Sequence, residues 1–179
     1  MVYVFLADGF EETEALVPVD ILRRCGVDVV TVGVGKKTVT SSHKIPVIAD
    51  ITDTQATTGN LHAVILPGGM PGTLNLEKNQ TVQQYLSYAN SKELFICAIC
   101  AAPSILGHNG MLTGLKATCF PGFEKDLLGA EVKSDLAVAD GRFITGKGAG
   151  AAMEFALLIA ENLCGKEVSE KTRKSLQCQ

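Results

Sequence analysis

A cysteine stands where a short apolar run ends and a second apolar segment begins. The run from Leu94 to Ile99 is typical of a buried strand, and Pro103 suits the first turn of a following helix, where a missing N–H costs little. Cys100 lies at the joint, with small residues around it. This placement favours a nucleophile on a sharp strand-to-helix turn. The alternative is an ordinary buried thiol, since free cysteines are among the most buried residues.

Three acids stand where the first helix along the chain is expected to begin: Glu11, Glu12 and Glu14. One interpretation is compensation of the helix dipole, worth ~0.3–1 kcal/mol per acid. The other is that one acid meets Cys100, holds its proton in a partly desolvated site and donates to a thiolate. Helix N-terminal amides would then lower the pKa of Cys100. The spacing does not choose among the three acids.

A glycine pair follows another apolar run, in the segment Pro67-Gly68-Gly69. Glycines permit a turn that aims backbone N–H groups inward, so the N–H groups of Gly69 and Ala101 can form an oxyanion hole beside Cys100. The alternative is a simple tight turn. A second glycine-rich segment, 146–150, lacks the spacing of a phosphate-binding or dinucleotide-binding loop, and we interpret it as close helix–sheet approach.

The remaining cysteines and histidines do not predict a metal or redox centre. Cys97 and Cys100 have C-x-x-C spacing, but a redox dithiol begins a helix with its first cysteine, and Cys97 lies inside the expected strand. A structural zinc site needs a second close pair of ligands, which does not follow. The histidines (His43, His62 and His108) lie outside the expected site loops, which disfavours a cysteine–histidine peptidase. We therefore expect neither a metal nor another cofactor.

Strands alternate with helices along the chain, and the core strands are apolar on both faces. This pattern predicts an α/β fold with a doubly wound, mostly parallel sheet and helices on both faces. A ligand site then lies beyond the carboxyl ends of the strands, where four loops (8–14, 67–72, 99–102 and 120–123) should converge. Strands are expected at 2–7, 27–34, 61–66, 94–99, 116–120, 131–138 and 142–145, a hairpin at 38–49, helices at 12–25, 79–90, 100–108 and 148–164, and a frayed tail from Lys166.

Length and composition indicate one globular domain over residues 1–179, with 46% hydrophobic and 20% charged residues. A formal net charge of -3 argues against a nucleic-acid-binding surface. No apolar run reaches the roughly 18 residues of a membrane span. The chain starts in a strand-like run without a basic segment before it, so we expect a cytoplasmic protein whose six cysteines are free thiols.

An ordered set of short motifs resembles the ThiJ/PfpI superfamily, and within it the branch of the Parkinson-disease protein 7 and bacterial ThiJ-like proteins. The resemblance implies a flavodoxin-like fold with a nucleophile elbow, and a homodimer. It identifies Cys100 as the reactive cysteine, Glu14 as the carboxyl that bonds its thiolate, and Gly69 and Ala101 as backbone donors. It also implies that Arg24 approaches the site from a partner subunit. The motifs are Glu11–Glu14, Pro18–Asp20, Leu66–Gly69, Ala98–Pro103 and Phe155–Leu157.

The resemblance implies a deglycase or glyoxalase-like hydrolase, with methylglyoxal, another small carbonyl or a glycated protein as substrate. The alternative is a redox-sensing stress protein or chaperone that acts through oxidation of Cys100. Two departures matter: Phe120 stands where some members carry a histidine, and Ala101 stands where protease-like members carry one. A histidine relay is therefore absent, and the peptidase interpretation weakens. Cys119 is an extra thiol that can act as a resolving partner.

Overall fold

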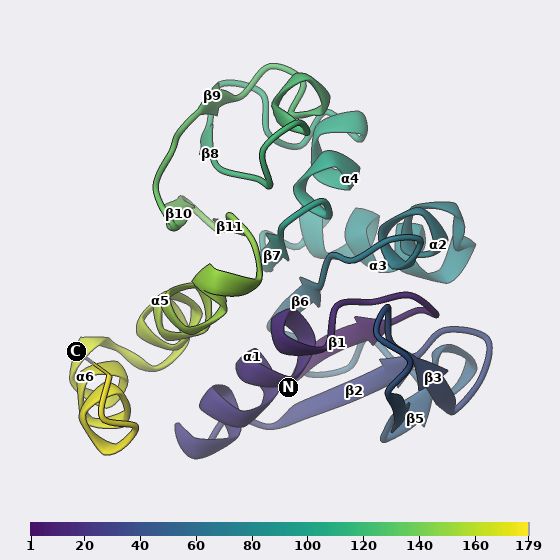
Figure 1. The fold of residues 1–179 in the computed structure, drawn as a ribbon, viewed down its shortest axis with the longest axis horizontal. Coiled ribbons are helices and arrows are strands. Elements are labelled where there is room, and N and C mark those ends of the chain that lie inside the picture. Colours follow the sequence, from purple (N-terminus) through teal and green to yellow (C-terminus); the bar gives the residue numbers. More distant parts are fainter. Residues whose placement is uncertain (179) are drawn as a thin grey trace.

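A seven-stranded sheet forms the centre of the molecule (Figure 1), and the computed structural model describes residues 1–178 of the chain. Every neighbouring pair in the sheet is parallel except β10 and β11, which form an antiparallel hairpin at one edge. The strands, in spatial order, are β10 (Ala137–Asp140), β11 (Phe143–Gly146), β7 (Phe95–Ile99), β6 (Ala63–Leu66), β1 (Val2–Leu6), β2 (Val29–Gly33) and β5 (Ile51–Thr52).

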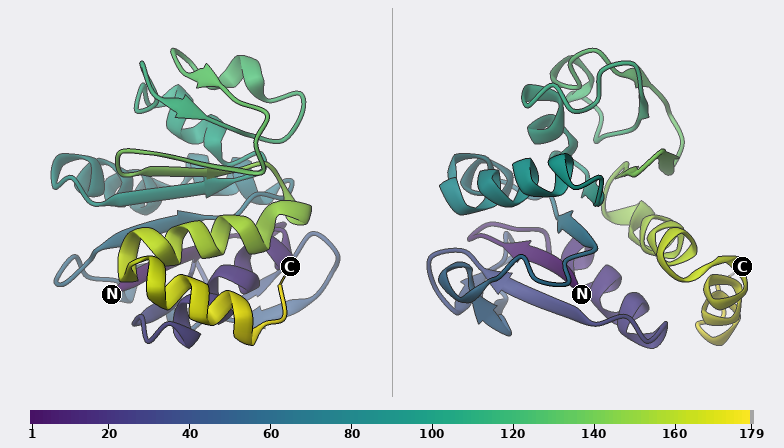
Figure 2. Two further views of the ribbon diagram at one scale, coloured as in Figure 1. Left: turned by 90° about the vertical axis from the view of Figure 1, so that its left-hand side faces the viewer. Right: turned by 180° about the vertical axis from the view of Figure 1, so that it is seen from behind.

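Helices cover both faces of the sheet, as Figure 2 shows, because the central strands bury both sets of alternating side chains. Tyr3 and Phe5 of β1 point into the core under α2, α3 and α4, whereas Val4 and Leu6 point into the core under α1 and α5. The helices are α1 (Glu12–Arg24), α2 (Gly72–Lys78), α3 (Gln80–Ser91), α4 (Pro103–His108), α5 (Ala152–Cys164) and α6 (Lys166–Ser175). Among the residues described, none of these helices combines the length and the apolar character that crossing a membrane requires.

The order of the strands reverses at β1, whose neighbours are β2 on one side and β6 on the other. The loops that leave the carboxyl ends of β1, β6 and β7 therefore lie side by side. Backbone hydrogen bonds join them: Glu11 N donates to Gly68 O at 2.9 Å, and Phe120 N donates to Cys100 O at 2.8 Å. The predicted meeting of four loops at one edge of the sheet is confirmed.

The structure corrects two of the expected strands. The segment 116–120 pairs only over β8 (Lys116–Ala117), which joins β9 (Glu131–Val132) in a separate two-stranded sheet. Beyond Ala117 the backbone bonds elsewhere, since Thr118 N donates to Thr145 Oγ1 at 2.9 Å. The segment 131–138 likewise divides between β9 and β10. The predicted hairpin at 38–49 is present as β3 (Thr38–Thr40) and β4 (Pro46–Ile48).

Two helices differ from the sequence prediction. Helix α2 begins at Gly72, inside a Gly/Pro-rich segment that local signals predict to be a turn, and it is held by the buried Leu76. The tail expected to fray forms α6, which packs on α5. Arg173 anchors it with two hydrogen bonds to Glu154, at 2.9 and 2.8 Å, and the buried Ser169 hydroxyl donates to Leu157 O. These contacts join residues distant in sequence, so local charge did not reveal them.

Candidate active site

Cys100 occupies a sharp backbone turn directly after β7. Its φ of +67° is a left-handed conformation that L-residues seldom adopt. Hydrogen bonds hold the turn from both sides, because Cys100 N donates to Gly146 O at 2.9 Å and Cys100 O accepts from Phe120 N. Strained non-glycine residues of this kind cluster at functional sites. The predicted elbow is present, although α4 begins at Pro103, three residues after the cysteine.

Glu14 is the acid that the fold brings to Cys100. It lies in the first turn of α1 and is 1% exposed. Its carboxylate Oε2 accepts a hydrogen bond from Gly68 N at 2.9 Å, and the carboxyl also hydrogen-bonds the Cys100 thiol. The other two acids have different contacts: Glu11 caps α1, and Glu12 bonds His43. The structure thus separates three acids that the spacing left equivalent.

Gly68 is the point at which the two side chains meet, and the sequence reasoning did not single it out. A Cβ atom on Gly68 would lie 2.6 Å from Cys100 Cβ and 2.7 Å from Glu14 Oε2. Both distances are far below van der Waals contact, so only glycine lets the thiol and the carboxyl approach across this strand end. The glycine pair after β6 is the sequence feature that marks this position, but the sequence predicts a role only for Gly69.

The backbone N–H groups of Gly69 and Ala101 both hydrogen-bond Cys100. Gly69 adopts φ +86°, a region suited to glycine, and its own carbonyl accepts from Thr73 N at 2.9 Å. A Cβ on Gly69 would lie 2.4 Å from Glu11 N, so the loop presses directly on the start of α1. Two donors therefore face the sulfur from two different loops.

Burial raises the pKa of Glu14 to about 7, and the negative charge of Glu11 acts in the same direction. Hydrogen bonds from the Cys100 thiol and the Gly68 N–H oppose this rise because they favour the carboxylate. A carboxyl with a pKa near neutrality can both accept and return a proton at physiological pH.

Burial also raises the pKa of Cys100, to about 12, and the charge of Glu14 and its hydrogen bond add to the rise. The Gly69 and Ala101 amides act in the lowering direction, as predicted, but they are outweighed. The expectation of a lowered Cys100 pKa is therefore wrong. Because Glu14 and Cys100 hydrogen-bond each other, the charge of either group raises the pKa of the other, and the two groups are coupled.

Phe120 and Cys119 lie on the fourth loop of the site. The Phe120 backbone is bonded to Cys100, and its side chain is 47% exposed. A Cβ on Gly148 would lie 3.1 Å from the Phe120 ring, so the ring rests on the backbone just before the helical turn that leads into α5. Cys119 is buried, and this burial raises its pKa to about 11. Its thiol is therefore protonated at neutral pH, in contrast to the attacking thiolate that thiol exchange requires.

Other predicted residues lie away from Cys100 within this chain. Arg24 stands at the opposite end of α1 from Glu14, where its Nε bonds Asp20 Oδ2 at 2.8 Å. Each histidine has its partner elsewhere: His43 bonds Glu12, His62 contacts the amino group of Met1, and His108 bonds Glu77. That a histidine does not serve as the base stays a prediction.

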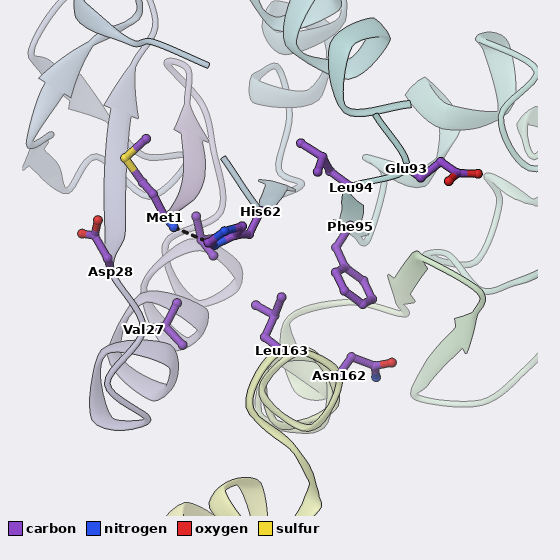
Figure 3. A pocket seen from close by; sticks show the side chains of 10 residues that line it. Met1, Val27, Asp28, His62, Glu93, Leu94, Phe95, Asn162 and Leu163 are labelled. Carbon is purple, nitrogen blue, oxygen red and sulfur yellow. Dashed lines mark hydrogen bonds between the residues drawn. The ribbon is translucent and has the colours of Figure 1, made fainter. Parts of the chain in front are cut away.

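A large cavity, of about 640 Å³, lies at the other end of the sheet (Figure 3). Its lining includes Val2 and Phe95, which begin β1 and β7, whereas Cys100 follows the carboxyl end of β7. A smaller cavity, of about 400 Å³, borders the catalytic side instead, because Phe120 and Gly148 line it together with Leu136.

The sequence of this chain is similar to those of known proteins. Residues 1–162 match the sequence profile of the DJ-1/PfpI family. The chain is 36% identical over 176 residues to the protein dj-1beta of Drosophila melanogaster, covering 97% of this chain and 94% of that protein. It is 30% identical over 168 residues to a Caenorhabditis elegans protein named glutathione-independent glyoxalase DJR-1.2, covering 93% of this chain and 89% of that protein.

The fold is likewise shared with solved structures. A crystal structure of a cysteine-to-alanine mutant of a DJ-1 superfamily protein from Salmonella typhimurium superposes with a TM-score of 0.94 and 34% sequence identity. The match covers 99% of this chain and 98% of that one. The predicted superfamily and the flavodoxin-like α/β architecture are therefore confirmed.

Proposed function

Because this chain belongs to the DJ-1/PfpI family, we propose that it is a cysteine-dependent deglycase or glyoxalase-like enzyme that acts on methylglyoxal or its adducts. One observation carries the proposal: the Cys100 thiol and the Glu14 carboxyl meet at Gly68, with two backbone N–H groups at the sulfur. A nucleophile, a proton acceptor and oxyanion donors are the parts that addition to a carbonyl requires.

The proposed reaction begins when the Glu14 carboxylate takes the Cys100 proton. The sulfur then forms a bond to the aldehyde carbon, and the electron pair of the C=O bond moves to oxygen, where the Gly69 and Ala101 amides stabilise it. Glu14 returns the proton to that oxygen, which completes a hemithioacetal. Proton transfer between the two substrate carbons gives a thioester, and water cleaves it to a 2-hydroxy acid and the free thiol. An adduct carries a hydroxyl and an amine or thiol on the former aldehyde carbon, so it must first lose that group. Glu14 takes the hydroxyl proton and passes it to the leaving amine or thiol, the bond from carbon to nitrogen or sulfur breaks, and the aldehyde that forms enters the sequence above.

One comparison supports this chemistry. One relative, at 30% identity, bears the name of a glutathione-independent glyoxalase. A glyoxalase that does not use glutathione needs a thiol of its own, and Cys100 offers one on a strained turn. Phe120 in place of a histidine leaves Glu14 as the proton carrier in this proposal.

The test is consumption of methylglyoxal, with the 2-hydroxy acid measured as product, by wild type, Cys100→Ser and Cys164→Ser. Cys164 is a matched control because it is also a half-buried free thiol, at the end of α5. We expect Cys100→Ser to lose turnover and Cys164→Ser to retain it. Wild-type rates in Cys100→Ser, with methylglyoxal or with freshly formed adducts, would contradict the mechanism.

A redox-sensing role is the second candidate, favoured by the contrast among the site cysteines. Cys100 is half-buried, whereas Cys97 and Cys119 are buried. Its sulfur has two N–H donors and the Glu14 carboxyl around it, which is the environment that stabilises a sulfinate. Mild peroxide followed by peptide mass spectrometry tests this role. Gain of two oxygens at Cys100 before the other cysteines react supports it, and prior oxidation of the other cysteines contradicts it.

We also propose that the chain functions as a homodimer in the cytoplasm. Large apolar side chains remain exposed on α1 and on the β3–β4 hairpin: Leu16 at 38%, Ile45 at 47% and Ile48 at 72%. Covering them with a second copy would place Arg24 of one subunit near the interface. Light scattering on the wild type and on Ile48→Lys tests this point, since a dimer that uses this surface should dissociate in the variant.

A further inference from the structure

Three hydrogen bonds form a closed ring around the start of α1. Glu11 N donates to Gly68 O at 2.9 Å, and Gly68 N donates to Glu14 Oε2 at 2.9 Å. Glu14 N then donates to Glu11 Oε2 at 2.7 Å, which closes the ring. Glu11 therefore holds both the loop that presses on Cys100 and the helical turn that carries Glu14.

Glu11 is the N-cap of α1, and a cap alone would explain only the last of these bonds. The bond from the Glu11 N–H to Gly68 is not part of the cap. It links Glu11 to the site, because Gly68 is the residue at which the Cys100 and Glu14 side chains meet. The fit is tight at the neighbouring position as well, where a Cβ on Gly69 would lie 2.4 Å from Glu11 N. Movement of Glu11 would consequently displace the loop whose Gly68 N–H bonds Glu14 and whose Gly69 N–H bonds Cys100.

Glu11 also places a carboxylate near Glu14. Burial is the main cause of the raised Glu14 pKa, and the Glu11 charge contributes in the same direction. Two further sets of titratable groups lie near this pair. Cys100 bonds Glu14 from the elbow, and the side-chain oxygen or nitrogen atoms of Glu12 and His43 lie within 4.8 Å of the Glu11 carboxylate. His43 comes from the segment between β3 and β4 and bonds Glu12 at 2.9 Å.

We propose that Glu11 is a positioning residue of the Glu14–Cys100 pair: its backbone and carboxylate hold Glu14 against the thiol, and its negative charge favours the protonated form of the Glu14 carboxyl. The proposal rests on the proposed function, since it assigns to Glu11 control over the pH at which that pair becomes reactive. It gives the acids of the segment 11–14 distinct roles, with Glu14 carrying the proton and Glu11 governing its release.

Two variants, isosteric with each other, separate charge from capping. Asp and Asn are both strong N-caps and differ only by the charge, so Glu11→Asp and Glu11→Asn should both preserve α1. The readout is the rate at which iodoacetamide alkylates Cys100 between pH 5 and pH 9, followed by peptide mass spectrometry. We expect the midpoint of the pH profile to fall in Glu11→Asn and to stay near the wild-type value in Glu11→Asp. At pH 6, Glu11→Asn should therefore react faster than Glu11→Asp.

Glu12→Gln is the control, because Glu12 is an acid of the same turn that bonds His43. Equal midpoints in Glu11→Asp and Glu11→Asn, or a shift in Glu12→Gln as large as that in Glu11→Asn, would overturn the proposal. Iodoacetamide alkylation does not depend on carbonyl turnover. A protein inert toward methylglyoxal but with the expected midpoints would refute the proposed function and leave the role of Glu11 standing.

Discussion

Glu14 accepts a 2.9 Å hydrogen bond from the backbone N–H of Gly68 at the place where the Cys100 side chain passes the same glycine. The carboxyl is thereby fixed on one side by a backbone donor and on the other by the thiol. The Glu14 carboxyl is therefore held in place but can still exchange a proton with the thiol. Substitutions at this contact and around it should therefore alter reactivity more than they alter the fold.

Replacement of Glu14 by Gln should remove the proton acceptor and keep the shape of the site, because the amide oxygen can still accept from Gly68. We expect turnover to fall by about 10²-fold or more, the usual contribution of general acid–base catalysis. Wild-type activity should rise as the pH increases through about 7, where Glu14 loses its proton, and this limb should be absent in Glu14→Gln. Steady-state rates between pH 5 and pH 9 check both points, and an unchanged limb would assign it to another group.

Glu14 should also make the free energy of unfolding depend on pH. Its pKa rises from 4.5 to about 7 on folding, so the folded state binds the proton more tightly. The resulting stabilisation is fully present below pH 4.5 and is lost as the pH rises through about 7, a change of about 3 kcal/mol. Urea unfolding at pH 4.5 and pH 7.5 should show the advantage of wild type over Glu14→Gln shrinking by roughly this amount. An advantage that grows with pH would contradict burial of the protonated acid.

Gly68→Ala should damage the site more than the fold. The added methyl group would lie 2.6 Å from Cys100 Cβ and 2.7 Å from Glu14 Oε2, so the two side chains must separate. We expect carbonyl turnover and Cys100 alkylation both to fall at least about tenfold, the size of effect that small misplacements have on reacting groups. Gly59→Ala serves as the control because a Cβ there meets nothing within 4 Å. Wild-type activity in Gly68→Ala would show that the contact is dispensable.

Phe120→His should raise turnover. The backbone at position 120 is tied to Cys100 by the 2.8 Å bond from Phe120 N, so an imidazole there would stand on the loop beside the elbow. A second proton carrier at this position is expected to increase the rate by about tenfold or more. Phe120→Leu keeps an apolar side chain and should not increase it. Equal rates in the two variants would mean that proton transfer through Glu14 already suffices.

Much of the framework could be predicted from local signals. The apolar run of β1, the helix closed by Gly26 at φ +79°, and the elbow at Cys100 each depend on neighbouring residues and appeared where expected. Helix α6 could not be predicted in this way, because contacts with α5 hold a segment that is charged along its length. Helix α2 was missed since its start carries Pro71 and Gly72, which usually mark a turn.

By itself, the sequence determined the alternation of strands and helices, the cysteine on a sharp turn and a set of acids at a helix start, because each is written in adjacent residues. Residue spacing left Glu11, Glu12 and Glu14 equivalent, and only the family resemblance pointed to Glu14. Tertiary structure brings Glu14 to Cys100 and decided that Gly68 is where they meet. Tertiary structure also set the pKa values, since burial raises the pKa of Glu14 and of Cys100, whereas nearby helix amides by themselves would lower the pKa of Cys100. Desolvation depends on everything packed around a group, and that packing exists only in the folded chain.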